Sequence, residues 1–154
     1  MKISLLSISI ALVLATACKS APNSTPVFHR SPDTALAALP FSEAVEANGF
    51  LFVAGQIGVT PGTLDVVKGG MAAEAKQTME NVRAVLERHG CTFEDVVKAT
   101  VFLADMQDWP AFNELYRTYF PKHFPARSAL GANGLARGAK VELEVIAVLP
   151  TTER

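Results

Sequence analysis

Apolar and polar residues alternate over residues 141–148, which read V-E-L-E-V-I-A-V. Successive side chains of a β-strand point to opposite faces, so this alternation predicts a strand with one wholly apolar face. That face consists of Val141, Leu143, Val145 and Ala147. The other face combines two carboxylates with two apolar side chains: Glu142, Glu144, Ile146 and Val148. We expect the first face to pack in the core and the second to require a different environment.

Two segments carry apolar residues at intervals of three and four, the spacing of one face of an α-helix. The first runs over residues 70–89 and is followed by Gly90, which favours the end of a helix. The second is expected to begin with Asp108 as its cap and Pro110 in its first turn, and to stop at Pro121. Its large side chains are expected in the core, together with the single tryptophan: Trp109, Phe112, Leu115, Tyr116, Tyr119 and Phe120.

The remaining β-rich segments complete the fold prediction. Residues 43–55 contain the pair Asn48-Gly49, which favours the two positive φ angles of a type I′ turn and predicts a β-hairpin. Residues 96–103 predict another strand, and a turn at residues 137–138 leads into the last one. The order β-β-α-β-α-β-β predicts an α+β fold, a mixed β-sheet with two helices packed on one face. The other face of the sheet is left open.

Residues 1–32 do not have the composition of a folded domain. A basic start, a short apolar run and small residues before Cys18 predict a signal peptide over residues 1–17. The sequence L-A-T-A-C also resembles the cleavage motif of bacterial lipoproteins, which carry lipid on the cysteine, although its leucine stands one position early. A lipid-anchored lipoprotein is favoured over plain secretion, and either alternative implies a periplasmic protein. Residues 18–32 predict a flexible tether, and residues 33–154 a single domain.

Charge and cysteine content argue against several classes of function. The formal net charge of −1 gives no basic surface for nucleic acid or for an anionic membrane. Two cysteines, of which Cys18 lies at the predicted processing site, make no disulfide framework. Cys91 is expected to be a small buried residue. The three histidines, His29, His89 and His123, match no familiar metal-ligand spacing, so the sequence predicts no metal site.

The mixed face of the last strand is the first candidate for chemistry. An open sheet face with Ile146 and Val148 is too apolar to remain in water, which favours its burial against further copies of the chain. Two alternatives remain for Glu142 and Glu144. They either lie at a subunit interface, where a carboxylate needs a partner, or lie in solvent and only keep the strand soluble.

Arg127, in F-P-A-R-S, is the second candidate. The small neighbouring residues leave room around its guanidinium, whose planar donors suit a carboxylate. That carboxylate is either internal, from Glu142 or Glu144, or it belongs to a substrate.

Ordered motifs between about Pro40 and Leu149 carry a family resemblance: P-F-S-E-A-V, V-A-G-Q-I, M-E-N-V-R-A-V-L-E, V-V-K-A-T-V-F-L-A-D-M, F-N-E-L-Y, F-P-A-R-S and G-A-K-V-E-L-E-V-I-A-V. In this order and spacing they resemble the RidA (YjgF/YER057c/UK114) family of reactive enamine and imine deaminases. The resemblance implies the chorismate mutase-like fold of that family. It also implies a homotrimer in which the sheets form a central barrel, with active sites at the subunit interfaces and neither metal nor organic cofactor.

The resemblance also assigns roles to single residues. Arg127 corresponds to the arginine that grips the substrate carboxylate, and Glu142 to the acid that positions water. Gly55 corresponds to a backbone position approached by the substrate carboxylate, and Asn113 to an asparagine beside the pocket. Glu144 has no such counterpart and is expected at a subunit interface or in solvent.

Two positions depart from the family pattern. Phe41 stands where the deaminases usually carry a tyrosine, so an aromatic wall remains without its hydroxyl group. Ala129 stands where many members carry a cysteine, so a thiol is absent.

The implied reaction is hydrolysis of a 2-imino acid, of the 2-iminopropanoate or 2-iminobutanoate type, to a 2-oxo acid and ammonia. The alternative is a non-catalytic protein of the same fold that binds small carboxylates or acts as a holdase at the cell envelope. The missing hydroxyl group, the missing thiol and the predicted export together make this alternative more strongly favoured here than it is for a cytosolic relative. The expected partners are a small 2-imino or 2-oxo acid and further copies of the chain, without nucleic acid. Membrane contact is expected only through the lipid anchor.

Overall fold

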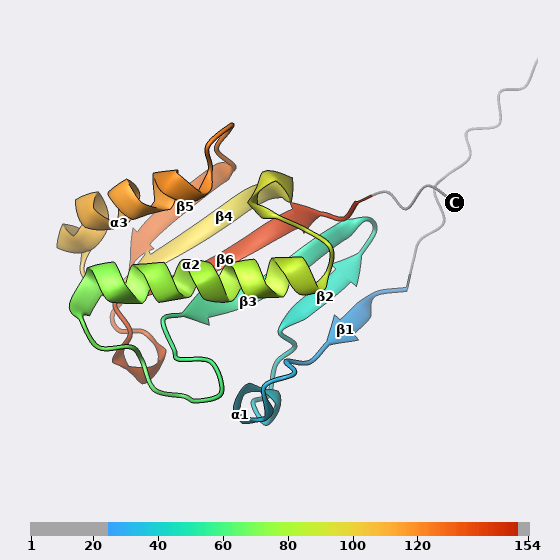
Figure 1. The fold of residues 1–154 in the computed structure, drawn as a ribbon, viewed down its shortest axis with the longest axis horizontal. Helices are drawn as coiled ribbons and strands as arrows, with labels where there is room; N and C mark the ends of the chain where they lie inside the picture. Colours follow the sequence, from blue (N-terminus) through green and yellow to red (C-terminus); the bar gives the residue numbers. More distant parts are fainter. Residues whose placement is uncertain (1–24, 151–154) are drawn as a thin grey trace, which may run out of the picture.

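The computed structural model describes residues 25–150, which form a six-stranded β-sheet with helices on one face (Figure 1). The strands are β1 (Val27–His29), β2 (Ala44–Ala47), β3 (Phe50–Ile57), β4 (Val96–Leu103), β5 (Ala126–Gly131) and β6 (Val141–Val148). The helices are α1 (Thr34–Ala37), α2 (Gly70–Arg88) and α3 (Trp109–Tyr116). The strand order across the sheet is β1-β2-β3-β6-β4-β5, with β4 and β5 parallel and the other neighbours antiparallel. The prediction of a mixed sheet is therefore confirmed.

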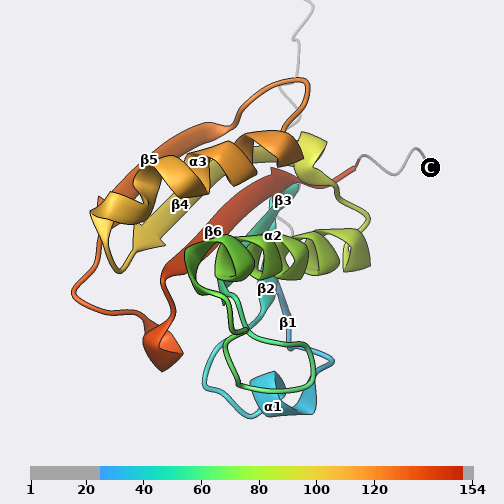
Figure 2. The ribbon, with the colours of Figure 1, turned by 60° about the vertical axis from the view of Figure 1, so that its left-hand side comes forward.

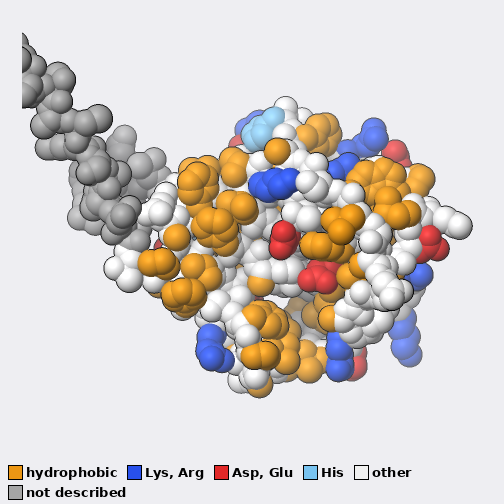
Figure 3. All heavy atoms as spheres, turned by 180° about the vertical axis from the view of Figure 1, so that it is seen from behind, with side chains coloured by type: hydrophobic (Ala, Val, Ile, Leu, Met, Phe, Trp, Pro, Cys, Tyr) orange, Lys and Arg blue, Asp and Glu red, His pale blue; other side chains and the backbone are white. Residues whose placement is uncertain are grey.

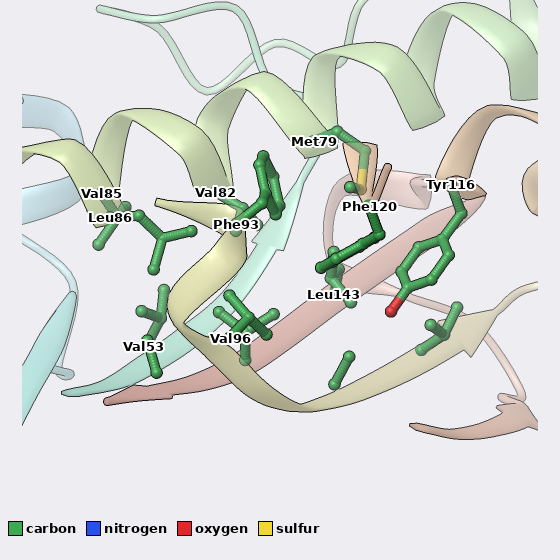
Figure 4. Close-up of a cluster of buried hydrophobic side chains, with 14 of the residues drawn as sticks. Val53, Met79, Val82, Val85, Leu86, Phe93, Val96, Tyr116, Phe120 and Leu143 are labelled. Atoms are coloured by element: carbon green, nitrogen blue, oxygen red, sulfur yellow. The ribbon is translucent and has the colours of Figure 1, made fainter. Parts of the chain in front are cut away.

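The two long helices lie next to each other on one face of the sheet (Figures 1 and 2). Helix α2 buries Met79, Val82 and Leu86 toward the sheet, and α3 buries Phe112 and Tyr116. These side chains meet the apolar face of β6 in a continuous core (Figure 4). Full burial of one large apolar side chain contributes about 1.5–3 kcal/mol, so this layer stabilises both the sheet and the position of β6.

The other face of the sheet is not covered by any helix of residues 25–150, and Figure 3 shows it from that side. Phe28, Val45, Phe52 and Ile146 are neighbours in register across β1, β2, β3 and β6. Phe28 is 69% exposed and Phe52 is 41% exposed, and further apolar side chains on this face are exposed as well. We call this surface the open face. Its apolar character agrees with the sequence prediction.

Glycines determine two of the chain reversals. Asn48 and Gly49 have φ angles of 50° and 81°, so β2 and β3 form the predicted type I′ hairpin. At the end of α2, Gly90 has a φ of 71°, a left-handed conformation that favours glycine.

The N-terminal part of the fold begins earlier than predicted. Val27–His29 form β1 and pair with β2, so the prediction of a tether up to residue 32 is wrong for these residues. The short helix α1 follows, capped by Asp33, whose side chain accepts a hydrogen bond from the backbone N–H of Ala35 at 2.9 Å. The predicted signal peptide and Cys18 lie outside the described residues. Within residues 25–150, no helix combines the length and apolarity needed to cross a membrane.

The start of α3 also differs from the prediction. Asp108 precedes the helix, but its side chain makes no capping hydrogen bond. A 3₁₀ turn, Met106–Asp108, comes first, and it is capped by Asp105, which accepts from the N–H of Gln107 at 2.8 Å. The carboxylate of Asp108 lies 3.8 Å from Lys140 Nζ instead. At its other end the helix becomes a 3₁₀ turn, Arg117–Tyr119, before the predicted stop at residue 121.

Candidate active site

Strand β6 places its two glutamates on the open face in different surroundings. Glu142 is paired with Ile57 of β3 and Phe102 of β4, whereas Glu144 is paired with Thr100 of β4. Glu142 is half-buried and Glu144 is exposed. The predicted alternation of β6 is confirmed, and its two carboxylates are not equivalent.

The carboxylate of Glu142 lies directly against the backbone of Gly55. A Cβ atom at position 55 would overlap Oε1 of Glu142, so this approach requires a glycine. Strand β3 is irregular at this point, because its register with β6 shifts between Val53 and Gln56. Irregularities of this kind redirect side chains and are frequent beside active sites.

A cavity of about 290 Å³ opens beside Glu142. Phe41, Gly55 and Arg137 line it together with the glutamate. Phe41 is 46% exposed, so its ring forms an accessible wall. Arg137 donates from Nε to the carbonyl oxygen of Leu64 at 2.9 Å, which anchors its guanidinium beside the cavity.

Burial raises the pKa of the Glu142 carboxyl group above its ordinary value, and the negative charge of Glu144 raises it further. A carboxyl group with a raised pKa holds a proton more readily than one in water. General acid–base catalysis requires this property of a group that must first accept and then return a proton.

Arg127 lies on the opposite face of the sheet. It is paired in β5 with Ala99 of β4, which is completely buried under the helices. Its guanidinium carbon lies 4.6 Å from the ring centroid of Trp109 and 4.5 Å from that of Tyr116. The two rings are two helical turns apart on α3 and therefore share one side of that helix. Cation–π contacts of this type contribute about 0.5–2 kcal/mol each and restrict the orientation of the arginine.

A second, more open cavity of about 500 Å³ lies beside Arg127. Asn113 and Tyr116 of α3 line it, together with Phe124. Burial raises the pKa of Tyr116 to about 12, although the charge of Arg127 acts in the opposite direction, so the phenol stays protonated at neutral pH.

The predicted site residues therefore fall into two groups. Phe41, Gly55 and Glu142 line the first cavity, which we call the acid half-site. Asn113 and Arg127 line the second, which we call the arginine half-site. Within residues 25–150, Arg127 makes no ion pair with Glu142 or Glu144, so an internal salt bridge does not account for it.

Other residues differ from the sequence-based assignments. Ala129 packs against the core and lines neither cavity. Gly55 makes room for the Glu142 carboxylate, a role that the sequence did not indicate. The sequence also gave no reason to place Arg137 beside the acid half-site. The spacing of Trp109 and Tyr116 on one helix face is the available signal for the aromatic platform, but by itself it predicts only core packing.

Comparisons of the sequence with known proteins identify one family. The model of the Endoribonuclease L-PSP family matches residues 32–149. A mouse protein named 2-iminobutanoate/2-iminopropanoate deaminase is 45% identical over 109 residues, which cover 71% of this chain and 81% of the relative. A RutC family protein from Synechocystis is 46% identical over 114 residues, which cover 73% of this chain and 88% of the relative.

Solved structures show the same architecture. The crystal structure of yeast Mmf1 matches with a TM-score of 0.76 and 36% identity. The match covers 82% of this chain and 100% of Mmf1. RidA from an Antarctic Psychrobacter matches with a TM-score of 0.73 and 31% identity, covering 79% of this chain and 98% of the other. The α+β fold with a six-stranded mixed sheet is thus the fold of the RidA structures. The chain belongs to the Endoribonuclease L-PSP family, which includes the RidA and YjgF proteins.

Proposed function

We propose that this protein hydrolyses reactive 2-imino acids and their enamine tautomers to 2-oxo acids and ammonia. The observation that carries the proposal is the half-buried carboxylate of Glu142, which is held against Gly55 beside a cavity and has a raised pKa. The mouse and human relatives that are named 2-iminobutanoate/2-iminopropanoate deaminase, at 45% and 42% identity, support the same reaction.

Arg127 binds the carboxylate of the imino acid. The guanidinium carbon of Arg127 lies over the rings of Trp109 and Tyr116. A cation–π contact uses the charge of the group, which leaves N–H donors for a carboxylate in the bidentate geometry that arginine favours. This contact orients the substrate, and orientation alone supplies a large part of many catalytic effects.

Glu142 moves the protons. Its carboxylate accepts a proton from a water molecule as the water oxygen bonds to the imine carbon. The substrate reacts as its protonated imine, so the C=N electron pair moves onto the nitrogen and a neutral carbinolamine forms. Glu142 then returns its proton to the nitrogen and the C–N bond breaks. Ammonia leaves with the electrons of that bond, and the hydroxyl group passes its proton to Glu142 as the carbonyl group of the 2-oxo acid forms.

The complete site requires more than one copy of the chain. The acid half-site and the arginine half-site lie on opposite faces of the sheet in one chain, so no single chain can apply both to one small substrate. Strand β5 lies at one edge of the sheet, and the apolar open face is exposed. A homotrimer that packs its open faces together buries the apolar surface and brings the arginine half-site of one subunit to the acid half-site of the next.

The same fold also suits a protein that binds small carboxylates without turnover. Phe41 supplies no hydroxyl group to the acid half-site, and no thiol exists at position 129. Binding without turnover needs Arg127 but not Glu142. The two functions therefore differ in their dependence on Glu142.

The reaction is tested by generating the imino acid from an amino acid with an amino-acid oxidase and measuring its consumption. We expect Arg127→Ala to lower kcat/KM about 10- to 100-fold, because charge-assisted hydrogen bonds contribute about 1.5–3 kcal/mol. Glu142→Gln removes the proton acceptor and is expected to lower kcat about 10²- to 10⁴-fold. Glu144→Gln, the same change at an exposed position of the same strand, is the control and is expected to keep most of the activity.

Wild-type protein that binds pyruvate or a similar oxo acid but does not consume the imino acid would support the non-catalytic alternative. Equal rates for wild type and Arg127→Ala would contradict the proposed reaction. Ribonuclease activity, which the family name suggests, is not proposed, because a net charge of −1 gives no basic surface for RNA.

We further propose that the protein is exported and anchored in the membrane by lipid on Cys18, as the composition of residues 1–17 suggests. Labelling of cells with radioactive palmitate should then mark the wild-type protein and not a Cys18→Ser variant. An unlabelled protein in the periplasmic fraction would indicate plain secretion. An unlabelled protein that stays in the cytoplasm would refute export.

A further inference from the structure

Two histidines and a glutamate from distant parts of the chain meet at the β1 edge of the sheet. His29 lies on β1, Glu46 on β2, and His89 directly after α2. The Nε2 atom of His29 lies 2.9 Å from Oε1 of Glu46, and Nδ1 of His89 lies 3.0 Å from the same oxygen. The two imidazole rings meet edge to face with their centroids 4.5 Å apart. We propose that these three residues bind a first-row divalent metal ion such as zinc.

The distances suit a metal ion. The three ligand atoms all lie within 4.8 Å of one another. Ligands of a tetrahedral zinc ion, each about 2 Å from the metal, are about 3.3 Å apart. Small side-chain movements are therefore sufficient to place all three atoms around one ion.

Hydrogen bonding within the protein leaves one of these atoms unsatisfied. The Nε2 atom of His29 is buried, and within residues 25–150 it has no hydrogen-bond partner. Its contact with Oε1 of Glu46 is short but does not have hydrogen-bond geometry, and the same carboxylate oxygen also lies beside Nδ1 of His89. A buried polar atom without a partner is unfavourable, and a metal ion removes this penalty by accepting its lone pair.

The chemistry of the ligands also favours such an ion. Two neutral imidazoles and one carboxylate are a ligand set found in zinc proteins, and they leave room for a water molecule or another ligand. The side chain of His89 is 10% exposed and those of His29 and Glu46 are 31% and 32% exposed, so the site is sheltered but accessible. The neighbouring cation, Arg88, is paired with Glu43, which limits its repulsion of a metal ion.

The site is separate from the proposed deaminase residues. None of the three ligands lines the acid half-site or the arginine half-site. A metal ion here would connect β1, an edge strand, with β2 and the end of α2. Because it would bind the folded chain and not the unfolded one, it would raise the melting temperature. The sequence predicted no metal site, because ligands so far apart in the chain form no recognisable spacing.

The test measures zinc binding to the purified full-length protein after treatment with EDTA. Isothermal titration calorimetry is expected to show one zinc ion per chain, and the melting temperature is expected to rise with zinc. His29→Ala and His89→Ala should each lower zinc affinity at least about tenfold and abolish the rise in melting temperature. Glu46→Gln keeps the size of the side chain, and it should weaken binding even if a histidine variant fails to fold.

His123→Ala is the matched control. His123 is the third histidine of the sequence, and its Nε2 lies 3.0 Å from the carbonyl oxygen of Glu94. This variant should bind zinc like the wild type. X-ray absorption at the zinc edge should show two imidazole ligands. A folded wild type that binds no zinc, or equal zinc binding by wild type, His29→Ala and His89→Ala, would overturn the proposal.

Discussion

Glu142 and Glu144 belong to the same strand, carry the same functional group and share one face, yet they meet different surroundings. Glu142 is pressed against Gly55 beside a cavity, and Glu144 is exposed. Burial and the charge of its neighbour raise the pKa of Glu142. Because folding disfavours the charged form of this side chain, the ionised Glu142 carboxylate lowers the stability of the folded protein. Functional groups often have such a cost.

This cost has a predictable pH dependence. Below the ordinary pKa of a glutamate, the side chain is protonated in both the folded and the unfolded chain, and the shift has no effect. As the pH rises, the unfolded chain releases the proton before the folded chain does, so the free energy of unfolding falls until the pH exceeds the raised pKa. The loss is then complete.

Glu142→Gln should therefore be more stable than the wild type at pH 7.5 and nearly equal to it at pH 4. A gain of 1 kcal/mol corresponds to roughly 2–4 °C in melting temperature for a chain of this size. Thermal unfolding at both pH values measures this difference, with Glu144→Gln as the control for removing any charge from this strand. The prediction fails if both variants change the melting temperature by the same amount at each pH.

At the scale of elements, local chemistry explains what the sequence predicted well. The Asn48-Gly49 turn, the apolar spacing of α2 and the alternation of β6 are local properties, and all three are confirmed. The strand β1 was missed because its three residues, Val27–His29, follow a segment rich in serine and proline and form a strand only through pairing with β2. Asp108 stands at the predicted N-cap position of α3 but makes no capping hydrogen bond with its side chain, and Asp105 caps the 3₁₀ turn that precedes the helix.

The site was predicted less completely than the elements, because its geometry depends on tertiary packing. Arg127 and Glu142 could be named from motifs, but the face of the sheet that each occupies depends on the pairing of β4 with both β5 and β6. The aromatic platform for Arg127 depends on how α3 packs over β5, and the close approach of Glu142 to Gly55 depends on an irregular register. These are tertiary properties that residue spacing does not contain.

At the scale of the whole molecule, the two half-sites of one chain lie on opposite faces of the sheet, so the proposed reaction would depend on assembly. The open face exposes Phe52 and other apolar side chains, which favours burial against further copies. If the site forms between subunits, each site takes Arg127 from one chain and Glu142 from another. A defect in one residue can then be complemented by a chain that carries a defect in the other.

Mixing two impaired variants should therefore restore activity. When Arg127→Ala and Glu142→Gln chains are dissociated, mixed in equal amounts and reassembled as a closed ring, about a quarter of the sites receive an intact arginine and an intact glutamate. The deaminase assay is expected to show about that fraction of wild-type activity, and each variant reassembled alone should show only its own low residual activity. Phe52→Asp places a charge on the open face, so adding it to both variants should prevent both assembly and recovery, which light scattering can follow. Mixed oligomers without recovered activity would show that the two half-sites do not cooperate across the interface.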